Sequence, residues 1–233
     1  VTCQGSVAPL QQVVGKPVHY IPPGVDAIRF RPTRGTRTTD VYYMGRRSAV
    51  THDALIRLLE SREITYAFDS IIGPNVNHTR QHRQLLAGAI QNSRYFIVHK
   101  AKADLDSHTF GQEEVGLRYF EGAAGGAVMI GSAPRVDAFD QCFDWPDAVI
   151  PMDYDCPSIG EFLSELDRQP ERLERVRCQN VVQSLRRHDW CYRWSEMLQT
   201  VGLPIGDGVH RRISHLNAAA EVAKRLFVEN ATA

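Results

Sequence analysis

The sequence predicts an α/β fold in which helices cover both faces of a doubly wound parallel sheet. Short β-rich runs alternate with stretches of helical periodicity over most of the 233 residues, a pattern typical of repeated βαβ units. Several of these runs are almost entirely apolar, as expected for strands that are covered on both faces. Strands are therefore expected at residues 40–44, 64–68, 94–99, 127–131 and 147–152.

Helical patterns fill the intervals between these strands and most of the C-terminal part. Leucines at helical spacing occupy residues 51–61, and residues 78–91 show the same periodicity. A further helix is expected to begin near Gly116, and its small residues suit close packing of that helix on a strand. The sequence thus supplies a covering helix for each side of the sheet.

The C-terminal part is predicted to be mainly helical. Ser158 and Glu161 have the spacing of a capping box, and Pro170 suits the start of a helix that continues to about Leu198. A last helix, at about 214–228, is expected to pack against the domain through one apolar side. The residues on that side are Leu216, Ala220, Ala223 and Phe227.

The N-terminal part differs from the rest. Residues 16–32 contain four prolines and no helical period, so they are expected to form an ordered, extended connection at a domain boundary. The preceding residues 1–15 are too few to form a domain. Because the chain does not begin with Met, it is expected to be processed or to be a piece of something longer.

Composition excludes several classes of function. The formal net charge is +0, so no global field attracts nucleic acid or anionic lipid, and any anion binding must be local. Five cysteines without a Cys-x-x-Cys pair favour a reducing, cytoplasmic setting over a disulfide framework. No apolar run is long enough for a transmembrane segment, and no signal peptide is visible. Peripheral contact with a membrane stays open.

Ligands of doubly wound sheets bind beyond the carboxyl ends of the strands, which here selects the loops at 45–48, 100–114 and 131–135. In the first loop, Arg46 and Arg47 can hold phosphate oxygens, although a pair of solvated arginines is the alternative. In the second, Gly116 permits close approach of a ligand to the backbone, and the adjoining helix start can bind an anion.

Three glutamates lie around this helix start. Glu121 falls among residues that should be buried, and a buried carboxylate needs partners. Helical spacing would place Glu114 and Glu121 on one face, with Glu113 somewhat off it, but spacing does not choose between the two acids. A solvated helix face remains the alternative. A glycosidase with two catalytic carboxylates fits poorly, because such acids project from separate strands or loops.

Two other patterns are interpreted as structural. His78 and His82 have the spacing of a metal pair but lack the glutamate of His-Glu-x-x-His, so no metal site is predicted. Trp190, Trp194 and Leu198 lie on one helical stripe, which indicates core packing more than a platform for stacking bases.

Four segments together resemble a known family. "PPGVDAIRFRP", "YMGRRS", "EEVGLRYFEGAAGGAVMIG" and "HDWCYRWSEML" are similar to the C-terminal, donor-binding half of retaining nucleotide-sugar glycosyltransferases of the group 1 type. These enzymes have the GT-B fold, with two Rossmann-like domains. The resemblance runs from about Lys16 to Leu203. It implies a remnant of an N-terminal domain and a linker at 1–32, a Rossmann-like nucleotide-sugar-binding domain at 33–203, and a helical tail at 204–233.

The resemblance also implies roles for individual residues. Glu113 would face hydroxyls of the donor sugar, Glu121 would accept hydrogen bonds from the ribose, and the backbone at Gly116 and Leu117 would meet the diphosphate. Arg46, in a loop with Gly45 and Arg47, would neutralise the diphosphate. The lysine that usually follows this arginine is missing, and His52 occupies its neighbourhood. A second positive charge would then come from His52, Arg47, Lys100 or Lys102.

By the same resemblance, the chain would use a UDP-, GDP- or ADP-sugar as donor and no cofactor. It would be incomplete without an N-terminal Rossmann-like domain, which carries the acceptor site in this fold. The departing phosphate is thought to deprotonate the acceptor, so Glu113 would position the sugar and not act as a base. Two alternatives remain open: a catalytically silent Rossmann-like module, and an epimerase acting on nucleotide sugars with the same fold.

Overall fold

A parallel sheet forms the centre of the molecule. The computed structural model describes residues 1–32, 35–69, 78–101, 103, 109 and 111–231. Within these residues the sheet has five strands in the order β2-β1-β3-β4-β5, and every neighbouring pair is parallel. The strands are β1 (Thr39–Tyr43), β2 (Tyr66–Phe68), β3 (Ser93–Val98), β4 (Val128–Gly131) and β5 (Ile150–Pro151). The predicted doubly wound, Rossmann-like α/β fold is confirmed, and each strand overlaps its predicted range.

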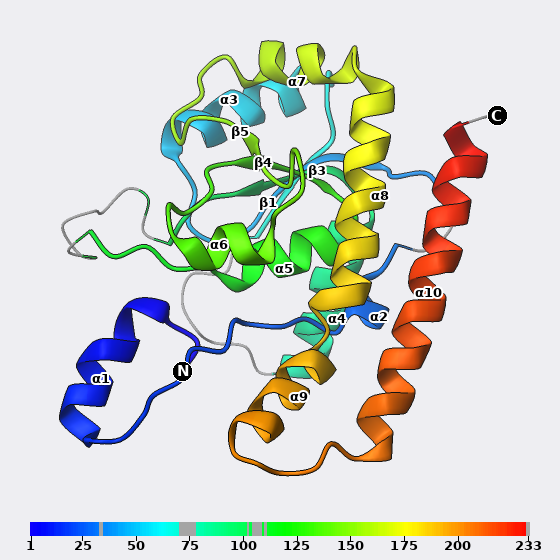
Figure 1. Ribbon diagram of the computed structural model, residues 1–233. Coiled ribbons are helices and arrows are strands. Elements are labelled where there is room, and N and C mark those ends of the chain that lie inside the picture. Colours follow the sequence, from blue (N-terminus) through cyan, green and yellow to red (C-terminus); the bar gives the residue numbers. More distant parts are fainter. Residues whose placement is uncertain (33–34, 70–77, 102, 104–108, 110, 232–233) are drawn as a thin grey trace.

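Helices cover both faces of the sheet (Figure 1). On one face, α3 (Ala49–Glu60) and α7 (Ile159–Asp167) bury Leu55 and Leu163 against side chains of β1 such as Val41. On the other face, α4 (Thr79–Gln91), α5 (Leu117–Ala124) and α6 (Asp137–Cys142) pack in a second cluster, which contains Tyr42 of the same strand. Successive residues of β1 therefore point into opposite layers, as the two-residue period of a strand requires.

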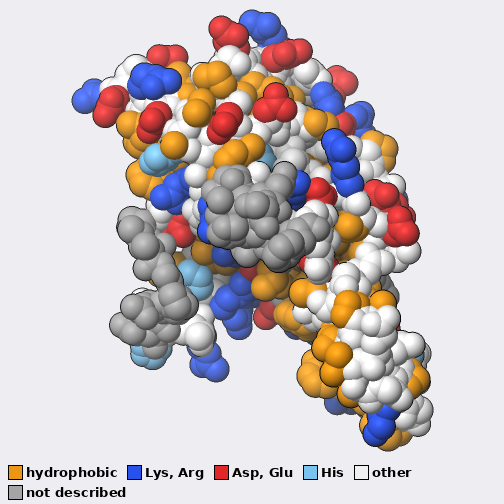
Figure 2. Space-filling model, turned by 90° about the vertical axis from the view of Figure 1, so that its left-hand side faces the viewer, with side chains coloured by type: hydrophobic (Ala, Val, Ile, Leu, Met, Phe, Trp, Pro, Cys, Tyr) orange, Lys and Arg blue, Asp and Glu red, His pale blue; other side chains and the backbone are white. Residues whose placement is uncertain are grey.

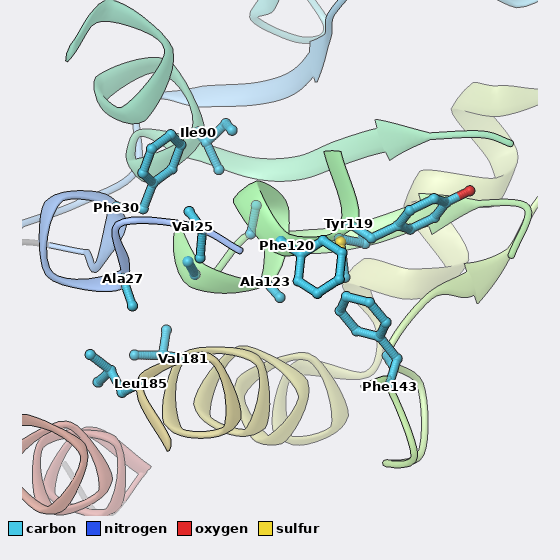
Figure 3. Packing of buried hydrophobic residues seen from close by; sticks show 14 of the residues in the cluster. Val25, Ala27, Phe30, Ile90, Tyr119, Phe120, Ala123, Phe143, Val181 and Leu185 are labelled. Carbon is cyan, nitrogen blue, oxygen red and sulfur yellow. The ribbon is translucent and has the colours of Figure 1, made fainter. Parts of the chain in front are cut away.

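Helix α5 packs closely on β3 and β4 at Gly122, where it has no side chain. A Cβ atom at Gly122 would lie 2.8 Å from Cδ1 of Phe96 and 2.7 Å from Sδ of Met129. Phe120 and Ala123 of the same helix are fully buried and point into the core (Figure 3). The expectation that small residues allow close packing of this helix is confirmed.

The long helix α8 (Pro170–Arg187) connects the two layers. Its first half contributes Leu173 and Val176 to the cluster around α3 and α7, and its second half contributes Val181 and Leu185 to the cluster around α5. Pro170 stands at its first position, as predicted. At Ser158, which precedes α7, the side chain makes no capping hydrogen bond, so the predicted capping box is wrong although the helix begins there.

The proline-rich connection is fixed to the end of α8. The backbone of Val25 pairs with the chain at residues 188–190, donating to His188 at 2.9 Å and accepting from Trp190 at 3.2 Å. Asp189 accepts a hydrogen bond from the amide of Ala27 at 3.0 Å. One turn of helix, α2 (Ala27–Phe30), interrupts the segment, so the prediction of a wholly extended connection is wrong there.

The predicted helix from Pro170 to about Leu198 is two helices. Asp189 breaks it and caps α9 (Trp190–Thr200) by accepting from the amide of Cys191. The buried face of α9 consists of Cys191 and Arg193, whereas Trp190 is 40% exposed and Trp194 is 56% exposed. The prediction that the tryptophan stripe packs in the core is therefore wrong.

The terminal segments have separate roles. Helix α10 (Asp207–Ala231) runs along α8 and buries Leu216 and Ala220, as its apolar side predicts (Figure 1). At the other end, the 3-10 turn η1 (Gln4–Ser6) and α1 (Val7–Val14) precede the proline-rich connection. None of the described helices combines the length and the apolar character that crossing a bilayer requires.

Gly131 is the glycine that the fold depends on most directly. It has φ +139°, and a Cβ atom there would lie 1.8 Å from the carbonyl oxygen of Val98 on β3. We expect Gly131→Ala to lower the free energy of unfolding by about 3 kcal/mol or more, through backbone strain and overpacking. Thermal or urea unfolding measures this loss.

The matched control for this substitution is Gly88→Ala in α4. A Cβ atom at Gly88 meets nothing within 4 Å, so alanine there should stabilise the chain by about 0.5–1 kcal/mol through its helix propensity. Equal stabilities of the two variants would contradict the packing described for the end of β4.

Candidate active site

A pocket of about 160 Å³ lies beyond the carboxyl ends of β1 and β3. These two strands mark the point where the order of the sheet reverses, because β2 lies on one side of β1 and the later strands follow β3 on the other. Doubly wound sheets bind ligands at such switch points. The described lining is Tyr43, Met44, Gly45, Arg46, Ile97, Val98, His99, Lys100, Ala101, Ala103, Arg118 and Tyr154.

The charge of this lining is positive. Among the described residues it includes Arg46, Lys100 and Arg118 and no aspartate or glutamate. Basic and acidic side chains are interspersed over the face shown in Figure 2, so the excess of basic groups belongs to the described pocket lining and not to the surface as a whole. A concave site with one sign of charge concentrates oppositely charged ligands. The pocket is therefore suited to an anion, although the chain as a whole has no net charge.

A second, larger groove lies near the opposite end of the sheet. It has about 890 Å³ between α3 and α7 and is open to solvent. Three of its charged side chains pair with one another: Arg94 donates to Asp40 and to Asp167, and Tyr95 also donates to Asp167. Because these groups are already satisfied and lie away from the switch point, the smaller pocket is the better candidate for chemistry.

The two arginines of the first predicted loop have different surroundings. Arg47 donates to the carboxylate of Asp69 at 2.8 Å and to its carbonyl at 2.7 Å, and the guanidinium lies over the ring of Phe68. The amide of Gly45 also donates to Asp69. Arg46 is exposed and lines the pocket. Of the two, Arg46 is placed to contact an anion there, whereas Arg47 fixes the loop to the end of β2.

His52 lies outside the described pocket lining. Its Nδ1 is 2.8 Å from the hydroxyl of Tyr66, and its ring meets the ring of Phe68 edge-on. Burial, with the nearby charge of Arg47, lowers the pKa of His52 below its usual value. A neutral ring in this place does not supply the second positive charge that the missing lysine would provide. Lys100 and Arg118 are the cations that the structure places in the pocket beside Arg46.

The two adjacent glutamates, Glu113 and Glu114, also have different hydrogen-bond partners. Glu113 accepts a hydrogen bond from Lys100 at 2.8 Å and another from the amide of Arg135 at 2.6 Å. The bond from Lys100 is the main cause of the lowered pKa of Glu113, so this carboxylate is ionised at neutral pH. Glu114 instead accepts from the amides of Gln4 and Gly5. Glu113 is thus the acid that contacts the pocket lining, while Glu114 fixes the N-terminal turn.

Gly116 is the N-cap of α5 and has an extended backbone with φ −73° and ψ 157°. Any residue can adopt these angles, and a Cβ atom there would meet nothing within 4 Å. The protein's own conformation and packing therefore do not require glycine. The missing side chain leaves space at the helix start, where the first amide groups have no acceptor within the helix. Leu117, the next residue, is 44% exposed.

Glu121 lies inside α5 and is completely buried. One of its oxygens accepts from Arg83 of α4 and the other accepts from Arg118, one turn earlier in α5. Because α5 begins at Leu117, Glu114 precedes it, and the predicted shared helical face of Glu114 and Glu121 is wrong. A hydrogen bond from a ribose to Glu121 stays a prediction, and a hydroxyl could reach the carboxylate only if an arginine moved.

His99 is a pocket residue that sequence reasoning missed. Its Nδ1 lies 3.0 Å from Oγ of Ser132, and its ring meets Tyr154 edge-on. Its Nε2 is buried and has no hydrogen-bond partner among the described residues. The available signal is its place at the carboxyl end of the predicted strand 94–99, of which it is the last residue.

No metal site stands out in the described part of the chain. Within it, no three His, Cys, Asp or Glu side chains cluster as a ligand set. His78 and His82 stand at the start of α4, and both are at least partly exposed. Lys102, another residue considered for the second positive charge, lies outside the described residues.

Residues 46–199 match a family described as Glycosyl transferase-like. The chain belongs to this family. The matched segment begins at Arg46 and includes His99, Lys100, Arg118 and Tyr154, so most of the pocket lies within it. A search of curated proteins gives no match. Membership supports glycosyl transfer as the activity of this glycosyl transferase-like chain, with a sugar donor and an acceptor as its substrates.

The burial of His99 makes the stability of the chain depend on pH. Burial lowers the pKa of His99 to about 4, whereas an unfolded histidine titrates near 6.5. Below about pH 6.5 the unfolded chain binds this proton and the folded chain does not, so stability falls as the pH falls towards 4. Between pH 7.5 and 5.5 the expected loss from His99 is about 1 kcal/mol.

Melting temperatures of the wild type and of His99→Gln across this range measure that loss. The dependence on pH should be weaker in the variant, whereas His215→Gln, on an exposed part of α10, should behave as the wild type. An identical dependence in wild type and His99→Gln would show that His99 is not held neutral in the folded chain.

Proposed function

We propose that this chain binds a nucleoside-diphosphate sugar as donor for retaining glycosyl transfer, as the donor-binding half of a GT-B fold. The observation that carries the proposal is the basic pocket at the switch point between β1 and β3, with Arg46, Lys100 and Arg118 in its lining. The diphosphate is the negatively charged part of such a donor, and its charge is complementary to the positive charge of that lining. Membership of the family supports the transfer of a sugar, and the basic pocket supports a donor that carries a diphosphate.

The diphosphate lies, in this proposal, between the first loop and the start of α5. Arg46 contacts it from the loop after β1, Lys100 from the segment after β3, and the amides of Gly116 and Leu117 from the helix start. The space left at Gly116 permits that approach. A helix N-terminus favours an anion through its free amide groups and its dipole.

The same groups assist the reaction. In the transfer, the bond between the anomeric carbon and the diphosphate oxygen breaks, and the electron pair leaves with the diphosphate. The acceptor oxygen forms a new bond to the anomeric carbon on the same face, and its proton passes to the departing phosphate. Because negative charge grows on the leaving group, cations and amide groups already aimed at it lower the barrier. No cofactor takes part in this scheme.

Glu113 serves as a sugar-positioning residue. Its carboxylate is ionised and held between Lys100 and the amide of Arg135, so it joins the loops that follow β3 and β4. A carboxylate held in this way can accept hydrogen bonds from the hydroxyls of a sugar beside the diphosphate. A general base would need a pKa nearer to neutrality, whereas the hydrogen bond from Lys100 lowers the pKa of Glu113.

The domain organisation follows from this assignment. We take residues 33–203 as the donor domain, residues 1–32 as the linker and the remnant of a second domain, and residues 204–233 as a helical tail. The acceptor site belongs to that second domain. The contacts between Val25 and the α8–α9 junction fix the end of the linker on the donor domain.

Binding of UDP, GDP and ADP, measured by titration calorimetry, tests the proposal. At least one of them should bind the wild type, and Arg46→Ala and Lys100→Ala should each weaken it about 10-fold or more, because each removes a charged hydrogen-bond donor. The control is Arg211→Ala, an exposed arginine on α10, which should bind as the wild type. Failure of all three nucleotides would favour a silent Rossmann-like module instead.

A further inference from the structure

The buried carboxylate of Glu121 organises two arginines. Its side chain is fully buried, and each oxygen accepts from a different guanidinium, that of Arg83 or that of Arg118. A buried carboxylate is costly unless cations and hydrogen bonds compensate it, so both contacts belong to the stable arrangement. Glu121 therefore fixes where both guanidinium groups lie.

The two arginines differ in what lies beyond them. Arg83 lies over the ring of Phe30, 4.9 Å from its centre, and is absent from the described lining of the pocket. Arg118 belongs to that lining, and 35% of its side chain is exposed. Glu121 thus holds one guanidinium against the core and the other at the pocket.

The guanidinium of Arg118 is suited to binding phosphate oxygens in the pocket. It contacts Glu121 through Nη1, and a guanidinium carries further N–H donors in a planar fork that suits phosphate oxygens. Two other cations near the pocket each have an acid of their own, since Lys100 pairs with Glu113 and Arg47 with Asp69. One carboxylate shared by two arginines leaves a local excess of positive charge beside the start of α5.

We propose that Arg118 binds the diphosphate of the donor and that Glu121 is the positioning residue that holds Arg118 in place. The inference rests on the proposed function and names a further substrate-contacting residue of the same site. It differs from a ribose contact by Glu121, because the buried carboxylate acts on the ligand only through Arg118.

The test compares three ligands on five proteins. The ligands are the nucleoside diphosphate that binds the wild type, inorganic pyrophosphate, and the corresponding nucleoside without phosphate. The proteins are the wild type, Arg118→Gln, Glu121→Gln, the double variant that combines these two changes, and Arg83→Gln. The last is the matched control, because it removes the other partner of the same carboxylate. Calorimetry gives each dissociation constant, and circular dichroism and melting curves show whether each variant is folded.

We expect Arg118→Gln to weaken both the nucleotide and pyrophosphate about 10-fold or more, through loss of a charged donor. Arg83→Gln should change neither by more than about 3-fold, a difference smaller than 1 kcal/mol. Glu121→Gln should lose affinity for pyrophosphate as Arg118→Gln does. The double variant should lose little more, because both changes remove one interaction. Affinity for the nucleoside should stay unchanged throughout.

Unchanged pyrophosphate binding in Arg118→Gln would overturn the inference. Loss of nucleoside affinity in Glu121→Gln, with pyrophosphate binding retained, would also overturn it and would establish the ribose contact. If Glu121→Gln does not fold, the comparison of Arg118→Gln with Arg83→Gln still decides, since each leaves Glu121 one arginine. Wild-type binding of pyrophosphate but of no nucleotide would contradict the proposed function alone, and binding of neither would contradict both.

Discussion

The parallel pairing of β1 with β3 determines where this molecule can bind a ligand. Tyr43 pairs with Ile97, so the chain leaves both strands at the same edge of the sheet. The loop with Arg46 and the segment with His99 and Lys100 are thereby adjacent, although about 50 residues separate them along the sequence. The pocket exists because β2 lies on the far side of β1, which opens a crevice between the two loops.

Carboxylates within the protein orient the cations of this site. Glu113 holds Lys100, Glu121 holds Arg118 and Arg83, and Asp69 holds Arg47. Orientation of this kind lowers the reorganisation needed when charge grows on a leaving group. It also explains why acids that resemble catalytic carboxylates in the sequence are paired with basic groups in the fold. In the described lining of the pocket, the positive charge beside Arg46 comes from Lys100, which follows β3, and from Arg118 of α5.

Sequence reasoning reached the fold because strand composition and helical period are local properties. The five strands, the helix start at Pro170 and the close packing of α5 followed from such local patterns. The tryptophan stripe of α9 was misplaced because helical spacing shows which residues share a face. It does not show which face meets the core. Here the buried face carries Cys191 and Arg193, and Arg193 donates to the carbonyl of Pro23 in the proline-rich linker.

The side-chain contacts in the site could not be predicted from the sequence, for a related reason. His52 and His99 are placed by contacts with other elements, His52 with Tyr66 of β2 and His99 with Ser132 after β4. Arg118 is held by Glu121 of its own helix, which Arg83 of α4 also binds. No local pattern distinguishes an arginine that lines a pocket from one that is solvated. For Arg118 the only signal was its distance of three residues from Glu121, which is common on helices.

A structure of the chain with a bound nucleoside diphosphate tests the central claim most directly. We expect the diphosphate to lie between the Arg46 loop and the start of α5, with Arg46, Lys100 and Arg118 within hydrogen-bond distance of its oxygens. A diphosphate bound in the groove between α3 and α7, with the switch-point pocket empty, would contradict it.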